Sequence, residues 1–283
     1  MSAEPNCRLA TRKSPLAMKQ AEIVADLVRS RLNIQVEVIA MSTTGDRQAD
    51  WSLQERGGKG LFTKELEKAI LDGRADIAVH SAKDMPTEDP AGLKISSFLK
   101  REDPRDVLIT SKIDGDIERI ASGSPRRIRQ LQGRFPNIEW LELRGNVETR
   151  LRKIAELEEA DGTVLAAAGL NRLEISQYPG LNFEVMEFDQ MVPAPGQGAI
   201  AIQSKISDAE KYSVLGCPDT ERAVRLEREV LKRMGGGCQT ALGVHLSENL
   251  LYFFHEKTGI LCQKFDDSLK DHIIDNLVTK TRE

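Results

Sequence analysis

Residues 8–15 read RLATRKSP and begin the first strand–helix unit of the chain. The apolar residues before Arg12 predict a short strand. Ser14 followed by Pro15 predicts a helix start, because serine caps the first amides and proline fits the first helical position. Helical spacing of apolar residues continues to about residue 32, and residues 34–40 then alternate as a strand does. Strand, helix and strand in this order predict an α/β layer.

The ends of the predicted strands carry the first candidate site residues. Ligands of α/β sheets collect at the carboxyl ends of strands, next to helix N-termini, and Arg12 and Ser14 occupy such a place. Residues 75–81 (ADIAVHS) form another apolar strand, which leads to Lys83 and Asp84. This charged pair is a candidate site, although a surface Lys beside a surface Asp in a turn is the favoured explanation of the dipeptide alone.

The second half of the chain repeats this arrangement. Residues 107–109 and the region near Ile120 are strand-like, and residues 122–127 (SGSPRR) again place hydroxyl residues, a proline and basic residues at a helix start. Two arginines there oppose the helix dipole, and this makes sense if an anion binds to the amides and guanidinium groups. Strands predicted at 138–143 and 163–167 also lead into helices with arginine, at Arg144, Arg150 and Arg172.

The composition is that of an ordinary globular protein of two or three domains. The chain has 283 residues, of which 40% are hydrophobic and 30% are charged. No apolar run approaches the length of a membrane span and no signal-peptide pattern is present, so we expect a cytoplasmic protein. The formal net charge of −4 argues against a nucleic-acid binder. Cations that recur at strand ends in such a chain predict a small polyanionic ligand.

Two glycine-rich stretches are further candidates. Cys238 follows three glycines at 235–237, and glycines let a ligand approach the backbone closely, but a helix cap before a small buried cysteine is the favoured interpretation of this stretch alone. In residues 57–62 (GGKGLF), the amides and Lys59 could hold an anion, although a lid or a plain turn explains the stretch equally well. The four cysteines are scattered, so neither disulfides nor a metal site is predicted.

Seven ordered blocks make the chain resemble the porphobilinogen deaminase (hydroxymethylbilane synthase) family over nearly its whole length. They are residues 10–17 (ATRKSPLA), 57–62 (GGKGLF), 75–84 (ADIAVHSAKD), 101–106 (REDPRD), 143–150 (LRGNVETR), 195–198 (PGQG) and 236–239 (GGCQ). The resemblance implies an α/β fold with two doubly wound domains of periplasmic-binding-protein-like topology and a small C-terminal α/β domain with an antiparallel sheet. The domains are expected at 1–98 with 194–214, at 99–193 and at 215–283.

The resemblance also implies the chemistry. Members are transferases that condense four porphobilinogen molecules head to tail, with loss of ammonia, into the hydroxymethylbilane of tetrapyrrole (haem) biosynthesis. They are primed by a covalent dipyrromethane cofactor, expected here as a thioether on Cys238, and Asp84 is the expected catalytic residue. The residues expected to bind cofactor and substrate are Arg12, Ser14, Lys59, Phe62, Lys83, Ser122, Ser124, Arg126, Arg127, Arg144, Arg150, Arg172 and Gln197. We expect a monomer that acts on porphobilinogen, with no nucleic acid, membrane or metal as partner.

Two functions of other classes fit parts of the sequence. A non-catalytic two-domain binding protein for anionic small molecules would use the same arginines, but it would need neither Asp84 nor a reactive thiol. A thiol enzyme in which His80 or His245 activates Cys238 lacks a Cys–His signature. Moreover, His80 lies within an apolar strand, where we expect a core histidine rather than a general base.

Overall fold

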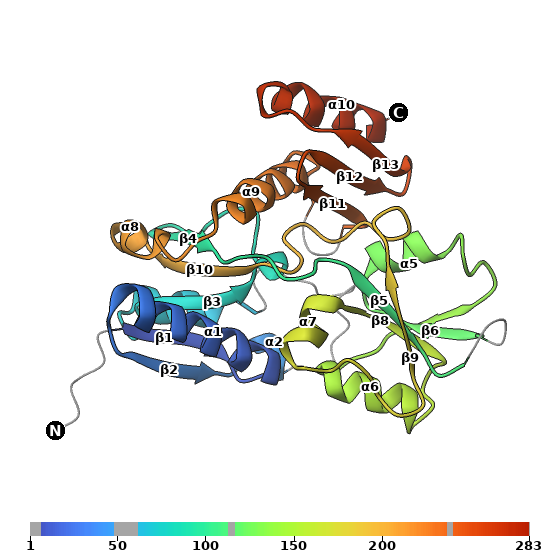
Figure 1. Ribbon diagram of the computed structural model, residues 1–283, viewed down its shortest axis with the longest axis horizontal. Coiled ribbons are helices and arrows are strands. Elements are labelled where there is room, and N and C mark those ends of the chain that lie inside the picture. The colour runs from blue at the N-terminus through green and yellow to red at the C-terminus, as the bar shows by residue number, and fades with distance from the viewer. Residues whose placement is uncertain (1–6, 48–61, 113–116, 237–239, 283) are drawn as a thin grey trace. The chain divides into compact units, whose positions relative to one another are not determined.

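The structure is a computed structural model that describes residues 7–47, 62–112, 117–236 and 240–282. The chain divides into two compact units, which we describe separately. Unit 1 comprises Met1–Glu102 and Ala199–Arg222, and unit 2 comprises Asp103–Gly198 and Ala223–Glu283. Each unit contains a five-stranded sheet, and unit 2 contains a three-stranded sheet as well (Figure 1). The three domain boundaries expected from the sequence stay a prediction.

Unit 1 is built on a mixed sheet with the strand order β2-β1-β3-β10-β4. The strands are β1 (Cys7–Arg12), β2 (Val36–Met41), β3 (Ile77–Ser81), β4 (Leu93–Phe98) and β10 (Ile200–Lys205). β1, β2 and β3 run parallel, whereas β10 is antiparallel to both β3 and β4. The other elements are α1 (Pro15–Leu32), α2 (Thr44–Arg47), α4 (Lys64–Leu71), η1 (Ala82–Asp84), η2 (Ile206–Asp208) and α8 (Ala209–Ser213).

Helices cover both faces of this sheet because successive side chains of a strand point to opposite sides. Leu9 and Ile77 belong to the apolar cluster formed with α1, whereas the next residues of the same strands, Ala10 and Ala78, pack with α4. Figure 1 shows α1, in blue, lying along β1 and β2. The predicted start of α1 is confirmed, because the Ser14 hydroxyl accepts a hydrogen bond from the Ala17 amide at 3.4 Å.

Unit 2 repeats the strand pattern of unit 1 in its five-stranded sheet, in the order β7-β6-β8-β5-β9. The strands are β5 (Asp106–Thr110), β6 (Arg119–Ala121), β7 (Glu139–Leu141), β8 (Gly162–Ala166) and β9 (Asn182–Met186), and the helices are α5 (Pro125–Leu131), α6 (Val147–Ala155) and α7 (Ala167–Arg172). Three strands are parallel, and β5 in the fourth place is antiparallel to its neighbours. β5 and β10 thus occupy the same position in their two sheets. Each is the first strand after the chain passes from one unit into the other.

The C-terminal part of unit 2 contains the predicted antiparallel meander. α9 (Pro218–Arg233) begins in unit 1 and continues into unit 2, and it is followed by β11 (Leu242–Ser247), β12 (Leu250–His255), β13 (Gly259–Lys264), η3 (Asp267–Leu269) and α10 (Lys270–Arg282). One apolar cluster joins α9 and α10 to β11 and β12. The predicted α/β class with a small antiparallel sheet is therefore confirmed.

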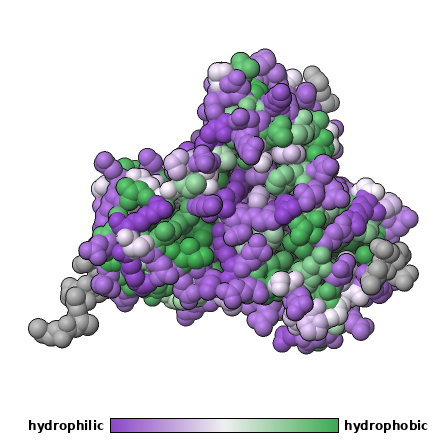
Figure 2. Space-filling view, in the orientation of Figure 1, coloured by the Kyte–Doolittle hydropathy of each residue, from purple (hydrophilic) through white to green (hydrophobic). Residues whose placement is uncertain are grey.

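Hydrophilic residues dominate the face shown in Figure 2, where the apolar ones form small separate groups. Within the described ranges, no helix has the length and apolar character needed to cross a membrane. The same residues contain no group of three or more His, Cys, Asp and Glu side chains arranged to hold a metal ion.

Residues 191–198, here called the connecting segment, lie directly against β11 within unit 2. The amide of Val244 donates to the carbonyl of Pro193 at 3.0 Å. A Cβ placed on Gly243 would lie 2.7 Å from the carbonyl oxygen of Val192 and 2.8 Å from its Cβ. Glycine at position 243 therefore permits a backbone approach that any larger residue would disturb.

We expect Gly243→Ala to lower the free energy of unfolding by about 1 to 3 kcal/mol, because the added methyl group overpacks the contact with Val192. Urea denaturation of the purified protein measures this change. Gly133→Ala is the matched control, since an added Cβ there meets no atom within 4 Å, and its effect should stay within about 0.5 kcal/mol. Equal midpoints for the two variants would show that β11 and the connecting segment are not tightly packed.

Candidate functional site

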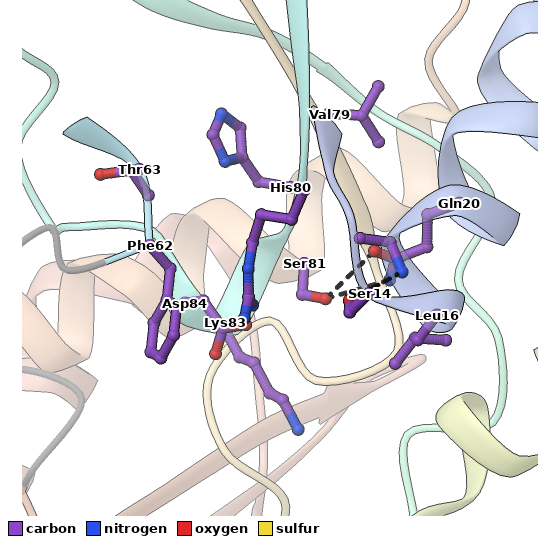
Figure 3. Close-up of a pocket in the computed structure, with 12 residues that line it drawn as sticks. Ser14, Leu16, Gln20, Phe62, Thr63, Val79, His80, Ser81, Lys83 and Asp84 are labelled. Atoms are coloured by element: carbon purple, nitrogen blue, oxygen red, sulfur yellow. Dashed lines mark hydrogen bonds between the residues drawn. The ribbon is translucent and has the colours of Figure 1, made fainter. Parts of the chain in front are cut away.

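The carboxyl end of β3 opens into a pocket of about 120 Å³ within unit 1 (Figure 3). Five residues predicted from the sequence line it together: Arg12, Ser14, Phe62, Lys83 and Asp84. They come from the end of β1, the start of α1, the residues before α4 and the turn after β3. The site thus lies where ligands bind in α/β sheets.

Asp84 is the carboxylate of this pocket. It ends η1, a turn that is tied to the sheet because the Ala82 amide donates to the Ala199 carbonyl at 3.0 Å. The side chain is half-buried and lies beside Phe62 in Figure 3. Within the described part of the chain, the Asp84 carboxylate makes no hydrogen bond or ion pair. Its acceptor positions are therefore available to N–H donors of a ligand.

Arg12 is held by an aromatic contact at the same pocket. Its guanidinium carbon lies 4.2 Å from the ring centroid of Phe62, which is cation–π geometry. Stacking uses the face of the guanidinium, whereas its N–H donors lie in the plane of the group. The Phe62 ring is itself seated on Gly45, since a Cβ at Gly45 would overlap it.

Gln20 and Ser81 also line the pocket, and the sequence analysis did not propose them. The Gln20 amide donates to the Ser81 hydroxyl at 3.0 Å, as the dashed line in Figure 3 shows. Gln20 is only 3% exposed on α1. The signal that could have identified it is an amide side chain at a position of the helix where spacing predicts a buried residue.

A group of buried polar residues lies between α4 and the sheet. His80 is 6% exposed, and burial lowers its pKa to about 4, assisted by the positive charge of Arg12 and opposed by Gln203. Burial also raises the pKa of Glu67, against the effect of Thr63 and Gln203. The expected burial of His80 is therefore confirmed, and its imidazole is neutral at physiological pH. It is not a fully satisfied core histidine, because its Nε2 has no hydrogen-bond partner among the described residues and the side chain lines the pocket.

Unit 2 contains a buried cluster of charged side chains. Asp106, the first residue of β5, is 0% exposed, and Arg126 and Arg127 at the start of α5 are 3% and 8% exposed. Nε and Nη2 of Arg127 donate to Oδ1 of Asp106 at 3.0 and 2.7 Å, and Nη1 of Arg126 lies 2.8 Å from Oδ2. Both arginines were expected to bind a ligand, whereas Asp106 was not predicted as their partner.

Positive charge exceeds negative charge in this cluster. Burial, and then the charges of Arg127 and Arg144, lower the pKa of Arg150 to about 10. Burial and the charge of Arg127 also lower the pKa of Arg126, although Asp106 opposes both effects. The buried Nε of Arg126 has no hydrogen-bond acceptor among the described residues. Repelling guanidinium groups and an unused donor are the features of an anion site.

The other predicted residues of unit 2 are placed as follows. Arg144 pairs with Glu142 at 2.6 Å, and Nε of Arg150 donates to the Gly145 carbonyl at 2.9 Å. Nη2 of Arg172 donates to the Gly198 carbonyl at 2.6 Å, at the end of the connecting segment. Gln197 in that segment donates to the Pro104 carbonyl at 2.7 Å and to Oδ1 of Asp106 at 3.1 Å.

Ser122 and Ser124 stand at the start of α5, as expected. The Ser122 hydroxyl accepts a hydrogen bond from the Ser124 amide at 3.2 Å. Ser124 holds the N-cap position, but its side chain makes no capping hydrogen bond, so the expectation that its hydroxyl caps this helix is wrong. Lys59 and Cys238 lie outside the described residues.

Residues 7–213 match the family model described as "Porphobilinogen deaminase, dipyromethane cofactor binding domain". The chain belongs to the porphobilinogen deaminase family. The porphobilinogen deaminase of Trichlorobacter lovleyi is 42% identical over 251 residues, which cover 86% of this chain and 79% of the relative. The porphobilinogen deaminase of Syntrophomonas wolfei is 43% identical over 243 residues, which cover 83% and 78%.

The solved structures that resemble the chain include a periplasmic binding protein. The periplasmic aliphatic sulphonate binding protein SsuA from Escherichia coli is 12% identical, with a TM-score of 0.43, and the match covers 98% of this chain and 87% of that one. The periplasmic VFT2 domain of BvgS from Bordetella pertussis is 18% identical, with a TM-score of 0.43, and the match covers 74% and 85%.

The lowered pKa of His80 predicts a specific acid sensitivity. Between pH 6.5 and pH 4 the unfolded chain binds a proton at this residue more readily than the folded chain, so stability falls as the pH falls through this range. Replacing His80 by Gln removes that contribution. The loss of unfolding free energy between pH 7 and pH 5 should then be smaller than in the wild type by about 2 kcal/mol.

Urea denaturation at both pH values provides this measurement. His272→Gln is the control, because it makes the same substitution at an exposed histidine on α10. An undiminished loss of stability in His80→Gln would mean that the buried imidazole is not the group responsible.

Proposed function

We propose that the chain is a transferase that condenses four porphobilinogen molecules head to tail, releases ammonia at each step and produces hydroxymethylbilane for tetrapyrrole biosynthesis. The observation that carries this proposal is the half-buried carboxylate of Asp84, which lines a pocket with Arg12 and Lys83 and makes no contact of its own among the described polar groups. Membership of the porphobilinogen deaminase family supports the same reaction.

The role proposed for Asp84 is electrostatic. Loss of ammonia from porphobilinogen leaves a positively charged pyrrole, and a carboxylate fixed beside the pyrrole N–H stabilises that charge. Asp84 is suited to this because the turn that carries it is tied to the start of β10 through Ala82. Arg12 and Lys83 on the same pocket can bind the acetate and propionate groups of the substrate, which orients the pyrrole toward Asp84.

We assign the remaining substrate carboxylates to the arginine cluster of unit 2. A growing pyrrole chain gains carboxylates with each unit, and each bidentate contact with a guanidinium contributes roughly 1.5 to 3 kcal/mol. The positive excess around Arg126, Arg127 and Arg150 supports this assignment. Arg144, Arg172, Gln197, Ser122 and Ser124 are proposed as further ligand contacts.

The donor set also fits the dipyrromethane that the family model names. Its carboxylates match guanidinium donors such as the buried Nε of Arg126, and its pyrrole N–H groups match a carboxylate such as Asp84. When bound, the cofactor supplies the terminal pyrrole carbon to which the first substrate is joined. Cys238 is the proposed attachment point, and Lys59 and Phe62 are proposed to contact the bound groups.

We also infer a cytoplasmic monomer that acts on a small-molecule substrate, without nucleic acid, membrane or metal as a partner. The net charge of −4 supports the exclusion of nucleic acid. The alternative of a non-catalytic binding protein for anionic small molecules would use the arginine cluster without Asp84. Ehrlich's reagent separates the two functions, because only the enzyme should give the colour of a bound dipyrromethane.

We expect Asp84→Asn to lower kcat by about 100- to 1,000-fold, because the neutral amide cannot stabilise positive charge in the pocket. Intact-protein mass spectrometry should show that the variant still carries its cofactor, which separates a catalytic defect from a loading defect. Asp72→Asn is the control, since Asp72 is an exposed residue that ends α4, and it should turn over normally. Near-normal turnover by Asp84→Asn would remove this residue from the mechanism.

We expect Cys238→Ser to lack any attached dipyrromethane, because a serine hydroxyl does not replace the thiolate as a nucleophile at neutral pH. Intact mass and the Ehrlich reaction both report the attachment. Cys262→Ser changes an exposed thiol on β13 and should retain the full cofactor mass. Full cofactor mass on the Cys238 variant would refute the attachment site.

A further inference from the structure

We propose that Asp106 is a positioning residue that orients Arg126 and Arg127 toward the carboxylates of the ligand. The inference rests on the proposed function of the arginine cluster. It assigns a role to a residue that neither contacts the pocket of Asp84 nor belongs to the expected binding set.

The backbone holds the Asp106 carboxylate in a fixed place. Asp106 is paired across the sheet with Ala166 of β8 on one side and with Met186 of β9 on the other. A residue held by two neighbouring strands has little freedom, so its buried side chain is a rigid reference point for longer side chains around it.

Both oxygens of this carboxylate are used to direct arginines. Oδ1 accepts from Nε and Nη2 of Arg127, whereas Oδ2 forms an ion pair with Nη1 of Arg126 at 2.8 Å that lacks hydrogen-bond geometry. The remaining orientation comes from backbone carbonyls, because Arg127 Nη1 donates to Val164 and Arg126 Nη1 donates to Val192, each at 2.7 Å. Two neighbouring guanidinium groups that would repel each other are thereby fixed side by side.

The connecting segment is joined to the same carboxylate. Gln197 donates to Oδ1 of Asp106 at 3.1 Å. Upstream, the Val192 amide donates to Oε1 of Gln130 at 2.8 Å, which keeps the Val192 carbonyl beside Arg126. Asp106 therefore connects three of the residues expected to bind cofactor and substrate: Arg126, Arg127 and Gln197.

The two arginines differ in what they still offer to a ligand. Nε, Nη1 and Nη2 of Arg127 each donate to a protein acceptor. The Nε of Arg126 is buried and has no acceptor in the described residues. After these bonds Arg127 keeps two of its five N–H donors, one on each Nη, and Arg126 keeps its buried Nε donor for a carboxylate.

Orientation and simple charge predict opposite results when Asp106 is neutralised. As a negative charge, Asp106 opposes the binding of an anion nearby, so removing the charge should strengthen binding. As a positioning residue, it keeps the guanidinium donors aligned, so removing it should weaken binding. The sign of the change decides between the two roles.

Asp106→Asn is the variant to test, because it preserves shape. The oxygen of the introduced amide can still accept from Arg127 and Gln197, but the amide nitrogen then faces Nη1 of Arg126, donor against donor. We expect binding of benzenehexacarboxylate, measured by calorimetry on the full chain with Cys238→Ser to keep the cofactor from competing, to weaken by about tenfold or more. In the chain with Cys238 intact, the fraction that carries dipyrromethane by mass should fall as well.

Asp103→Asn is the matched control. It makes the same change of charge three residues earlier, at a half-buried carboxylate that pairs with Arg105 at 2.8 Å. Its affinity for the probe should be unchanged or slightly higher. Unchanged or tighter binding by Asp106→Asn would overturn the positioning role alone, whereas a parent protein that does not bind the probe would overturn the function proposed for the whole cluster.

A double-mutant cycle with Arg126→Met separates positioning from general damage to the fold. Removing both members of a buried ion pair is often tolerated, so the double variant should fold even where a single one is weakened. If Asp106 acts through Arg126, adding Asp106→Asn to Arg126→Met should change the affinity by less than about twofold. A tenfold loss in both backgrounds would mean that Asp106 does not act through Arg126, and it would overturn the positioning of that arginine.

Discussion

The ion pairs of Asp106 set the arrangement of unit 2 around the start of α5. Burying a carboxylate costs several kcal/mol unless charged partners and hydrogen bonds compensate it. When one member of a buried ion pair is removed, the other remains as a buried charge without this compensation. Here two arginines and one glutamine compensate the carboxylate, and two backbone carbonyls accept hydrogen bonds from the same arginines. The carboxylate of Asp106, the first residue of β5, consequently holds both the start of α5 and the connecting segment.

The pocket of unit 1 offers a carboxylate beside two cationic side chains, Arg12 and Lys83, whereas the cluster of unit 2 consists mainly of guanidinium groups. Unit 1 presents the carboxylate of Asp84 at the end of β3, and the buried residues beneath it add no positive charge, because His80 is neutral, while burial raises the pKa of Glu67. The cluster around Asp106 in unit 2 has two buried guanidinium groups for one buried carboxylate. A pyrrole with acidic side chains can bind to a carboxylate through its N–H group and to arginine through its own carboxylates.

Much of the fold could be predicted because local patterns decided it. Ser14 and Pro15 identified the start of α1, and the apolar residues of 75–81 identified β3. β4 and β9 were missed. Both are edge strands of their sheets. The adjacent polar residues Ser96 and Ser97 end the alternation of β4, and β9 alternates over only five residues, which is too short to be distinctive. The Asp106 pairs join residues about twenty positions apart, which no local pattern records.

β10 and β5 occupy the fourth position of their sheets but come at different points of the sequence. This difference affects the order in which the two sheets can form during synthesis. In unit 1, β10 lies between β3 and β4, so the ribosome must pass residue 205 before the two halves of that sheet can be joined. All five strands of the corresponding sheet in unit 2 lie within residues 106–186. The middle of the sequence therefore contains a complete sheet before the beginning does, and the first four strands wait for a partner that is translated more than a hundred residues later.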